Sequence, residues 1–225
     1  MADPLISNIL GTYSRLRRGM AVIAFLLPLV LWLGGMAFFA TALQPSISAY
    51  YHAHENLRDI LVGVLFAVGT FLYLYKGETL IEDWLLNIAG ISAVGIAYFE
   101  MVKDSDCLPA QGITAHGFFA VLFFLAIFCV CLVDLRVFAD GGYRRVALRD
   151  VRYRWCACVM FLSIVVGVVY AIVLPGPTKL ALCNQNITFW VESFGIWGFS
   201  AFWYLRTREL DAQVSWLPWR KDSEA

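Results

Sequence analysis

Six long apolar runs make up most of this 225-residue chain and leave few folds open to it. A helix that crosses a bilayer needs about 20 mostly apolar residues. Runs of this kind lie at about 20–43, 60–75, 84–101, 115–138, 155–174 and 187–205. None of them alternates apolar and polar residues as a strand of a membrane barrel does. The sequence therefore predicts an all-α, polytopic membrane protein, with six transmembrane helices in one bundle and a single domain over 1–225.

Composition agrees with this class and excludes several others. Hydrophobic residues make up 60% of the chain and charged residues 15%, whereas soluble domains average about 45–50% and about 25%. An ordinary soluble enzyme or a disordered chain is therefore excluded. The 17 basic and 17 acidic residues cancel, so no excess of charge indicates a nucleic-acid partner. Membrane lipids are the expected partners.

Basic residues are distributed unequally between the two sets of predicted loops. Arg15, Arg17 and Arg18 precede the first run and should hold the N-terminus in the cytoplasm. When the loops alternate from that start, only three of the 17 Lys and Arg residues fall outside: Arg58, Lys103 and Lys179. Cytoplasmic loops are enriched in such residues, so both termini are predicted to be cytoplasmic. The charged turn at 76–83 is interpreted as solvated surface.

Ionisable residues gather at the outer level of this topology. Glu192, about five residues into the sixth run, is the most informative of them. A charge at the centre of a membrane helix costs roughly 2.5–3.5 kcal/mol, and such groups usually face a partner inside the bundle. His116 and Arg58 are available at a similar depth. We therefore expect an outer-facing polar pocket, lined by Ser46, Ser48, Asp59, Glu100, His116 and Glu192.

Each of these residues also has a purely structural interpretation. Asp59 could cap the second helix, because aspartate is favoured near helix N-termini. Glu100 could reach the membrane interface. His116 could form a hydrogen bond between helices. Both interpretations stay open for the group as a whole.

The six cysteines divide into two groups. Four lie inside predicted helices at C-x-C spacing, which places neighbours on different faces, and are expected to pack as small apolar residues: Cys129, Cys131, Cys156 and Cys158. Cys107 and Cys183 lie in outer loops. In an oxidising compartment they are expected to form a disulfide that ties two outer loops together. Glycines within helices are expected to permit close packing, and Pro28 is predicted to kink the first helix.

The segment PSISAYY at 45–51, followed by Arg58-Asp59 and a helix with Gly63, resembles an uncharacterised family of bacterial six-helix membrane proteins. The resemblance covers roughly 15–205 and includes further features: the Glu82-Asp83 turn, His116 and FWVE at 189–192. It implies a six-helix fold and a location in the bacterial inner membrane, but it implies no activity. The same loop, at 45–48, also resembles the DRAM-like six-helix proteins of eukaryotes.

Ser48 and His52 at S-x-x-x-H spacing, followed by Asp59, resemble the Ser/His/Asp zinc site of the CREST superfamily of membrane hydrolases. A catalytic zinc needs about three protein ligands and an open position for water. The resemblance implies catalytic candidates at Ser48, His52, Asp59 and His116, with zinc held by His52, His116 and a carboxylate of Asp59 or Glu192. The superfamily has seven helices and a late H-x-x-x-H pair, whereas this chain has no histidine after His116.

Three functional hypotheses are compatible with these features. The first, which we prefer, is a non-enzymatic membrane protein that binds a lipid or small ligand in the outer-facing pocket without a cofactor. The second is a zinc-dependent hydrolase acting on a lipid amide or ester. The third is an ion or proton pathway in a homo-oligomer, because few polar residues connect the two ends of one chain. No phosphate-binding loop, dinucleotide fingerprint or common hydrolase motif occurs.

Overall fold

The computed structural model describes residues 4–77, 79–101, 114–140 and 151–215. All regular secondary structure in these residues is helical, so the all-α prediction is confirmed for them. The helices are α1 Pro4–Leu29, the π-helical turn η1 Val30–Gly34, α2 Gly35–Phe39, α3 Tyr50–Ala53, α4 Glu55–Leu74, α5 Leu80–Tyr98, α6 Ala115–Asp140, α7 Val151–Val168, the π-helical turn η3 Val169–Val173, α8 Gly176–Asn184 and α9 Ile187–Ser215.

Five of the six predicted spans are long and apolar enough to cross a membrane. Within the described residues they are Gly11–Phe39, Glu55–Leu74, Leu80–Tyr98, Ala115–Val133 and Val151–Val168. These findings support an integral membrane protein with several spans. The sixth predicted span is one helix of 29 residues, α9, but it is less apolar because it contains Glu192, several tryptophans and serines, and a polar end after residue 205.

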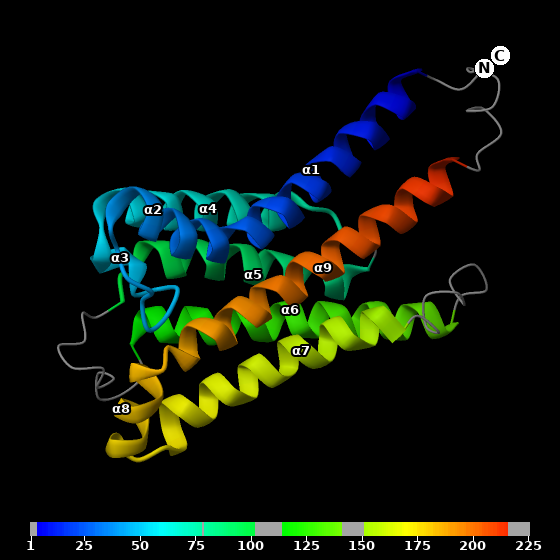
Figure 1. Ribbon diagram of the computed structural model, residues 1–225. Helices are drawn as coiled ribbons and strands as arrows, with labels where there is room; N and C mark the ends of the chain where they lie inside the picture. Colours follow the sequence, from blue (N-terminus) through cyan, green and yellow to red (C-terminus); the bar gives the residue numbers. More distant parts are fainter. Residues whose placement is uncertain (1–3, 78, 102–113, 141–150, 216–225) are drawn as a thin grey trace.

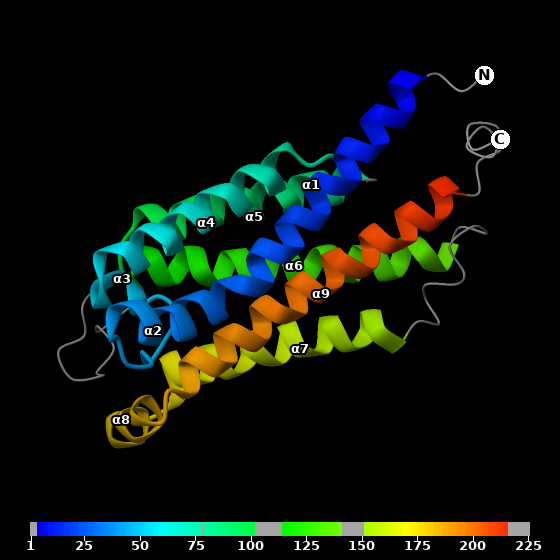
Figure 2. The same cartoon turned by 45° about the horizontal axis from the view of Figure 1, so that its top comes forward.

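The long helices form an elongated bundle with two distinct ends (Figure 1). In both Figure 1 and Figure 2, α9 runs along the bundle beside α1 and α7, while α4, α5 and α6 pack in series. One end, which we call the α8 end, carries α3, α8 and the chain between α2 and α4. Helix α1 begins and helix α9 finishes at the opposite end. Helix α9 therefore extends between the same two ends as the five apolar helices.

The first helix is longer than predicted and bends within its length. It begins at Pro4, and its α-helical bonding gives way to η1 after Leu29, one residue beyond Pro28. Proline has no N–H to donate, and sharp bends in helices accompany such interruptions. The bend predicted at Pro28 is visible where α1 meets α2 (Figure 1). The helix ends at Ala40, whose φ of 50° turns the chain.

The arginines that precede the first apolar run lie within α1, because this helix begins at Pro4. Arg17 is only 4% exposed, and its guanidinium lies 5.5 Å from the ring centroids of Tyr75 and Trp203. Aromatic faces attract such a cation. Arg18 forms an ion pair with Asp211 of α9. These side chains fasten α1 to the rest of the bundle.

The interpretation of the turn at 76–83 as solvated is wrong for Glu82. This residue is 1% exposed, and its Oε1 lies 2.5 Å from Nη1 of Arg206, which is 4% exposed. Helix α9 continues well beyond residue 205 and so carries Arg206 to the start of α5. Lys76, in contrast, is exposed and pairs with Asp83.

Glycines bring α4 and α5 into close contact. A Cβ atom on Gly90 would lie 2.7 Å from the carbonyl oxygen of Gly69, and one on Gly69 would lie 2.8 Å from that of Gly90. A Cβ on Gly95 would meet the ring of Phe119 in α6. The close-packing interpretation is confirmed at these positions. It fails at Gly63, where an added Cβ meets nothing within 4 Å.

The core has two parts. The larger cluster fills the middle of the bundle and includes Leu86, Met160 and Trp203. The smaller cluster lies at the α8 end and includes Tyr50 and Phe189, which are almost fully buried. Burial of these two rings anchors α3 and the start of α9 against each other, and this contact positions the polar segment described next.

Candidate functional site

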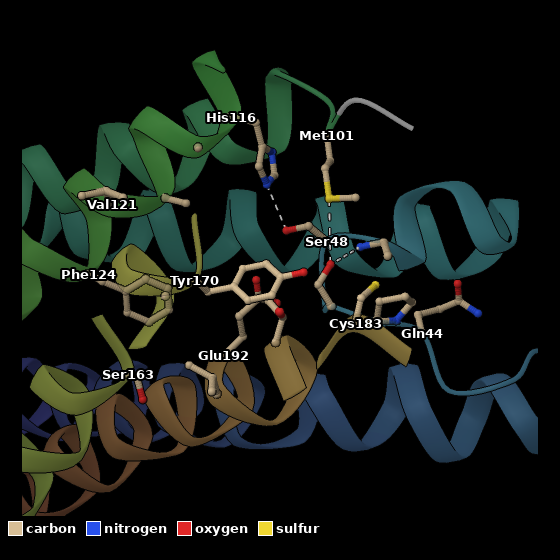
Figure 3. A pocket seen from close by; sticks show the side chains of 18 of the residues that line it. Gln44, Ser48, Met101, His116, Val121, Phe124, Ser163, Tyr170, Cys183 and Glu192 are labelled. Atoms are coloured by element: carbon tan, nitrogen blue, oxygen red, sulfur yellow. Dashed lines mark hydrogen bonds between the residues drawn. The ribbon is translucent and has the colours of Figure 1, made fainter. Parts of the chain in front are cut away.

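A cavity of about 450 Å³ lies at the α8 end, between the segment 44–53 and the helices α6, α7 and α9. Small-molecule sites commonly have volumes of about 300–1,000 Å³. The polar part of the described lining includes Gln44, Ser46, Ser48, His52, His116 and Glu192. The apolar part includes Ala120, Val121, Phe124, Ile164, Val168 and Val191. Figure 3 shows Ser48 and His116 toward one side of the cavity, with Val121 and Phe124 toward the other.

The segment before α3 holds its serines in a compact turn. The backbone N–H of Ala49 donates to Oγ of Ser46 at 3.1 Å, and that of Tyr51 donates to the carbonyl of Ser48 at 3.1 Å. Serine is suited to this position because its hydroxyl can accept from a backbone N–H a few residues later. These bonds fix Ser48 at the wall of the cavity.

Two hydrogen bonds fasten this turn to the start of α9. The N–H of Phe189 donates to the carbonyl of Pro45 at 2.8 Å, and the N–H of Ile47 donates to Oε2 of Glu192 at 2.7 Å. Glu192 therefore ties the serine-bearing turn to α9.

The partners suggested for Glu192 by the sequence are bonded elsewhere. Arg58 pairs with Asp59 at 3.3 Å and lies over the ring of Tyr51. His116 binds other groups, described next. The position of Glu192 inside an apolar run predicted that its carboxylate needs a partner. The partner is a backbone N–H, and because every residue except proline has one, the sequence could not identify it.

His116 joins three parts of the chain. Its Nδ1 lies 2.9 Å from the carbonyl oxygen of Phe99, and its Nε2 lies 3.0 Å from Oγ of Ser48 (Figure 3). A carbonyl oxygen can only accept, so Nδ1 carries the proton and donates it. In the neutral imidazole, Nε2 is then an acceptor. The hydroxyl of Ser48 therefore donates to His116.

The other two histidines have structural contacts. His52 donates from Nε2 to the carbonyl of Met101 at 2.6 Å, so two histidines bind carbonyl groups just after α5. His54 is the N-cap of α4, where its Nδ1 accepts from the N–H of Asn56 at 3.2 Å. The capping role considered for Asp59 thus belongs to His54.

The structure brings part of the predicted pocket together. Four of its six predicted residues line the cavity: Ser46, Ser48, His116 and Glu192. Asp59 lies in the second turn of α4, and its side chain is 70% exposed. Glu100 follows α5 and is also exposed. The sequence reasoning missed the apolar wall of α7, because residues that face a cavity and residues that face lipid have the same composition.

Within the described residues, no three His, Cys, Asp or Glu side chains lie together as metal ligands would. His52 and His116 each bind a different backbone carbonyl. Asp59 lies at the surface beside Arg58. In the described residues, His52, His116 and Asp59 therefore do not form the three-ligand group that the zinc hypothesis requires.

The cysteines fall into distinct environments. Cys131 and Cys156 are buried in the larger core cluster, which confirms the packing interpretation for them, whereas Cys158 is exposed. Cys183 is buried and lines the cavity. Its expected partner, Cys107, lies outside the described residues, so their pairing stays a prediction.

Comparisons with protein-family models, with curated proteins and with solved structures find no match. A functional conclusion therefore depends on the residues of the site, because a fold alone does not define a function.

Proposed function

We propose that this protein binds an uncharged, single-chain membrane lipid, with its polar head group beside Ser48 and His116 and its acyl chain along α6 and α7. The observation that carries this proposal is that Ser48 and His116 lie toward one side of the cavity, whereas Val121 and Phe124 lie toward the other. Sites for amphiphiles need both surfaces, because apolar area supplies affinity and a few polar groups fix orientation. Hydroxyl, imidazole and amide side chains are suited to bind hydroxyl and ester groups.

The charge of the lining favours an uncharged head group. Among the described residues that line the cavity, Glu192 is an acid and none is a lysine or arginine. A phosphate or carboxylate placed there would lose its hydration and meet no opposite charge, which is costly. A glycerol or other neutral head group avoids this cost.

The cavity also lies where a lipid can reach it. It follows the junction of α6 with α7 and α9, and α6 contacts these two helices far less than it contacts α5. A loosely packed junction opens more readily than a tightly packed one. We infer that the acyl chain enters between α6 and α7 from the bilayer.

The placement in the membrane belongs to the same proposal. The loop charges favour cytoplasmic termini, which place the α8 end and its cavity at the outer surface if α9 is the sixth span. The predicted Cys107–Cys183 disulfide would then lie on the outer side, beside the cavity. A bacterial inner membrane is the location implied by the family resemblance.

A cavity-filling variant tests this proposal. Gly167 lines the cavity, and a Cβ atom there meets nothing within 4 Å, so Gly167→Phe should fill the space without moving the backbone. The control is Gly63→Phe, at a helical position that is equally open but lies outside the cavity lining. Binding of 1-monooleoylglycerol to the full chain in detergent is measured by native mass spectrometry.

We expect one bound lipid per chain in the natural protein and in Gly63→Phe. In Gly167→Phe we expect affinity to fall about tenfold or more, which corresponds to about 1.4 kcal/mol. Oleate, which is anionic at neutral pH, should bind more weakly than monooleoylglycerol. Equal binding by all three proteins, or a preference for oleate, would contradict the proposal.

A further inference from the structure

Ser48 and His116 are arranged as a nucleophile and its base are in enzymes that transfer acyl groups. Oγ of Ser48 donates to Nε2 of His116 at 3.0 Å, within the range expected for such a pair. The carbonyl of Phe99 accepts from Nδ1 at 2.9 Å and so fixes both the tautomer and the ring orientation. In serine hydrolases a carboxylate commonly has this orienting role. Here a backbone carbonyl has it.

We propose that Ser48 is a nucleophile that accepts an acyl group, with His116 as its general base, and that the substrate class is the carboxylic ester of an uncharged lipid. This inference rests on the proposed function, because the cavity must first hold the lipid. It needs no metal ion, since the nucleophile is the serine hydroxyl itself.

The residues around Ser48 and His116 would position the ester group of a bound lipid next to Oγ of Ser48. His116, Ala120 and Phe124 follow one another at intervals of four residues, so they lie on one face of α6, and all three line the cavity. An acyl chain packed along this face would end beside His116. Its ester carbonyl would then lie next to the hydroxyl of Ser48, at the boundary between the apolar and polar parts of the cavity.

The reaction balances with water as the second reactant. Oγ of Ser48 attacks the ester carbonyl carbon while its proton passes to Nε2 of His116. The bond from that carbon to the alcohol oxygen breaks, and His116 returns the proton to the departing alcohol. Water, deprotonated by His116, then attacks the acyl-serine ester. A fatty acid leaves, and the proton returns from His116 to Oγ of Ser48.

Other serines at the cavity lack this arrangement. Oγ of Ser163 donates to the carbonyl of Val159 in its own helix at 3.0 Å. Oγ of Ser46 accepts from the N–H of Ala49. In the described contacts neither hydroxyl is bonded to a histidine, so Ser48 alone of the three should be activated.

Reaction with a fluorophosphonate–biotin probe tests the inference, because such probes phosphonylate activated serines. The full chain in detergent is labelled and the modified residue is identified by peptide mass spectrometry. Ser48→Ala and His116→Gln are compared with Ser92→Ala, a control outside the cavity lining, where Oγ of Ser92 donates to the carbonyl of Ile88 in its own helix. Binding of monooleoylglycerol is measured on each protein to show that the cavity is intact.

We expect one adduct, on Ser48, at equal rates in the natural protein and in Ser92→Ala, and none on residue 48 of Ser48→Ala. His116→Gln should react about 10²-fold or more slowly, the usual contribution of a general base. Absence of labelling in a protein that binds monooleoylglycerol would overturn the nucleophile and leave the proposed function standing. Absence of labelling together with absence of lipid binding would overturn both the nucleophile and the proposed function. Equal rates in the natural protein and in His116→Gln would also overturn the role of His116.

Discussion

Glu82 and Arg206 form a buried ion pair near the opposite end of the bundle from the cavity. The two side chains are 1% and 4% exposed, and Arg206 lies over the rings of Tyr75 and Trp203, which Arg17 also contacts. A buried ion pair adds little beyond well-packed apolar residues, but removing one partner leaves an uncompensated charge. The pair therefore makes the junction of α1, α5 and α9 sensitive to single substitutions.

Glu82→Gln keeps the shape of the side chain but removes its charge, so it should leave Arg206 buried without its counter-charge. We expect a loss of about 3–5 kcal/mol in the free energy of unfolding, read as a large fall in Tm of the detergent-solubilised protein. The control is Glu55→Gln, at an exposed position in the first turn of α4. Similar small shifts in both variants would show that the buried pair does not contribute to stability.

Individual residues differ in how far the sequence predicts them. The positions of Glu192 and His116 in their apolar runs predicted that both line one pocket, and both line the cavity. Their partners, the N–H of Ile47 and the carbonyl of Phe99, are backbone groups, which every residue has. Sequence patterns identify side chains that need a partner, but only the fold decides which backbone group meets them.

At the scale of elements, α4 and α5 show how glycine sets the distance between helices. Gly69 and Gly90 lie against each other with no room for a methyl group on either. The atom that an added Cβ would meet is a backbone oxygen, which cannot rotate away. These two helices therefore keep their close contact only with glycine at both positions.

Gly90→Ala should separate α4 from α5 and destabilise the protein by about 1–3 kcal/mol, the usual cost of overpacking. Gly63→Ala on α4 is the matched control: its Cβ meets nothing, and alanine stabilises a helix over glycine by roughly 0.5–1 kcal/mol. Thermal unfolding in detergent should thus shift in opposite directions. A shift of the same sign and size in both variants would contradict the close-contact account.

Helix positions were predicted better than helix ends. Hydropathy marks the apolar part of a helix, whereas backbone hydrogen bonding continues until a cap or a break stops it. Helix α1 therefore begins at Pro4 and α9 extends to Ser215, both beyond the apolar runs. The polar extensions of these two helices carry Arg17 and Arg206 into contact with Tyr75 and Trp203.

At the scale of the whole molecule, the number of crossings depends on α9. Five helices qualify as spans among the described residues, and α9 runs beside them between the same two ends of the bundle (Figure 2). Six crossings place both termini on one side of the membrane, and five place them on opposite sides.

We expect six crossings with both termini in the cytoplasm. Green fluorescent protein fused to the C-terminus should then fluoresce, and alkaline phosphatase fused at the same position should be inactive. The same pair of reporters at the N-terminus should give the same result. Opposite results at the two termini would mean that α9 does not cross.

The cavity itself is the feature of the whole molecule that sequence patterns predict least. Its polar rim follows from the topology, but its apolar wall needs the packing of α6 against α7 and α9. The exposed Leu162 and the cavity-lining Ile164 lie on the same helix and are both aliphatic. Only their orientation in the bundle separates a lipid-facing residue from a site residue.

Photo-crosslinking locates a bound lipid most directly. A monoacylglycerol with a diazirine in its acyl chain is irradiated with the full protein in detergent, and the adducts are mapped by mass spectrometry. Adducts that are concentrated on Phe124, Ile164 and Val168, and that competing monooleoylglycerol removes, are the result we predict. Adducts spread over exposed positions such as Phe161 and Leu162, unaffected by competitor, would contradict a lipid site in this cavity.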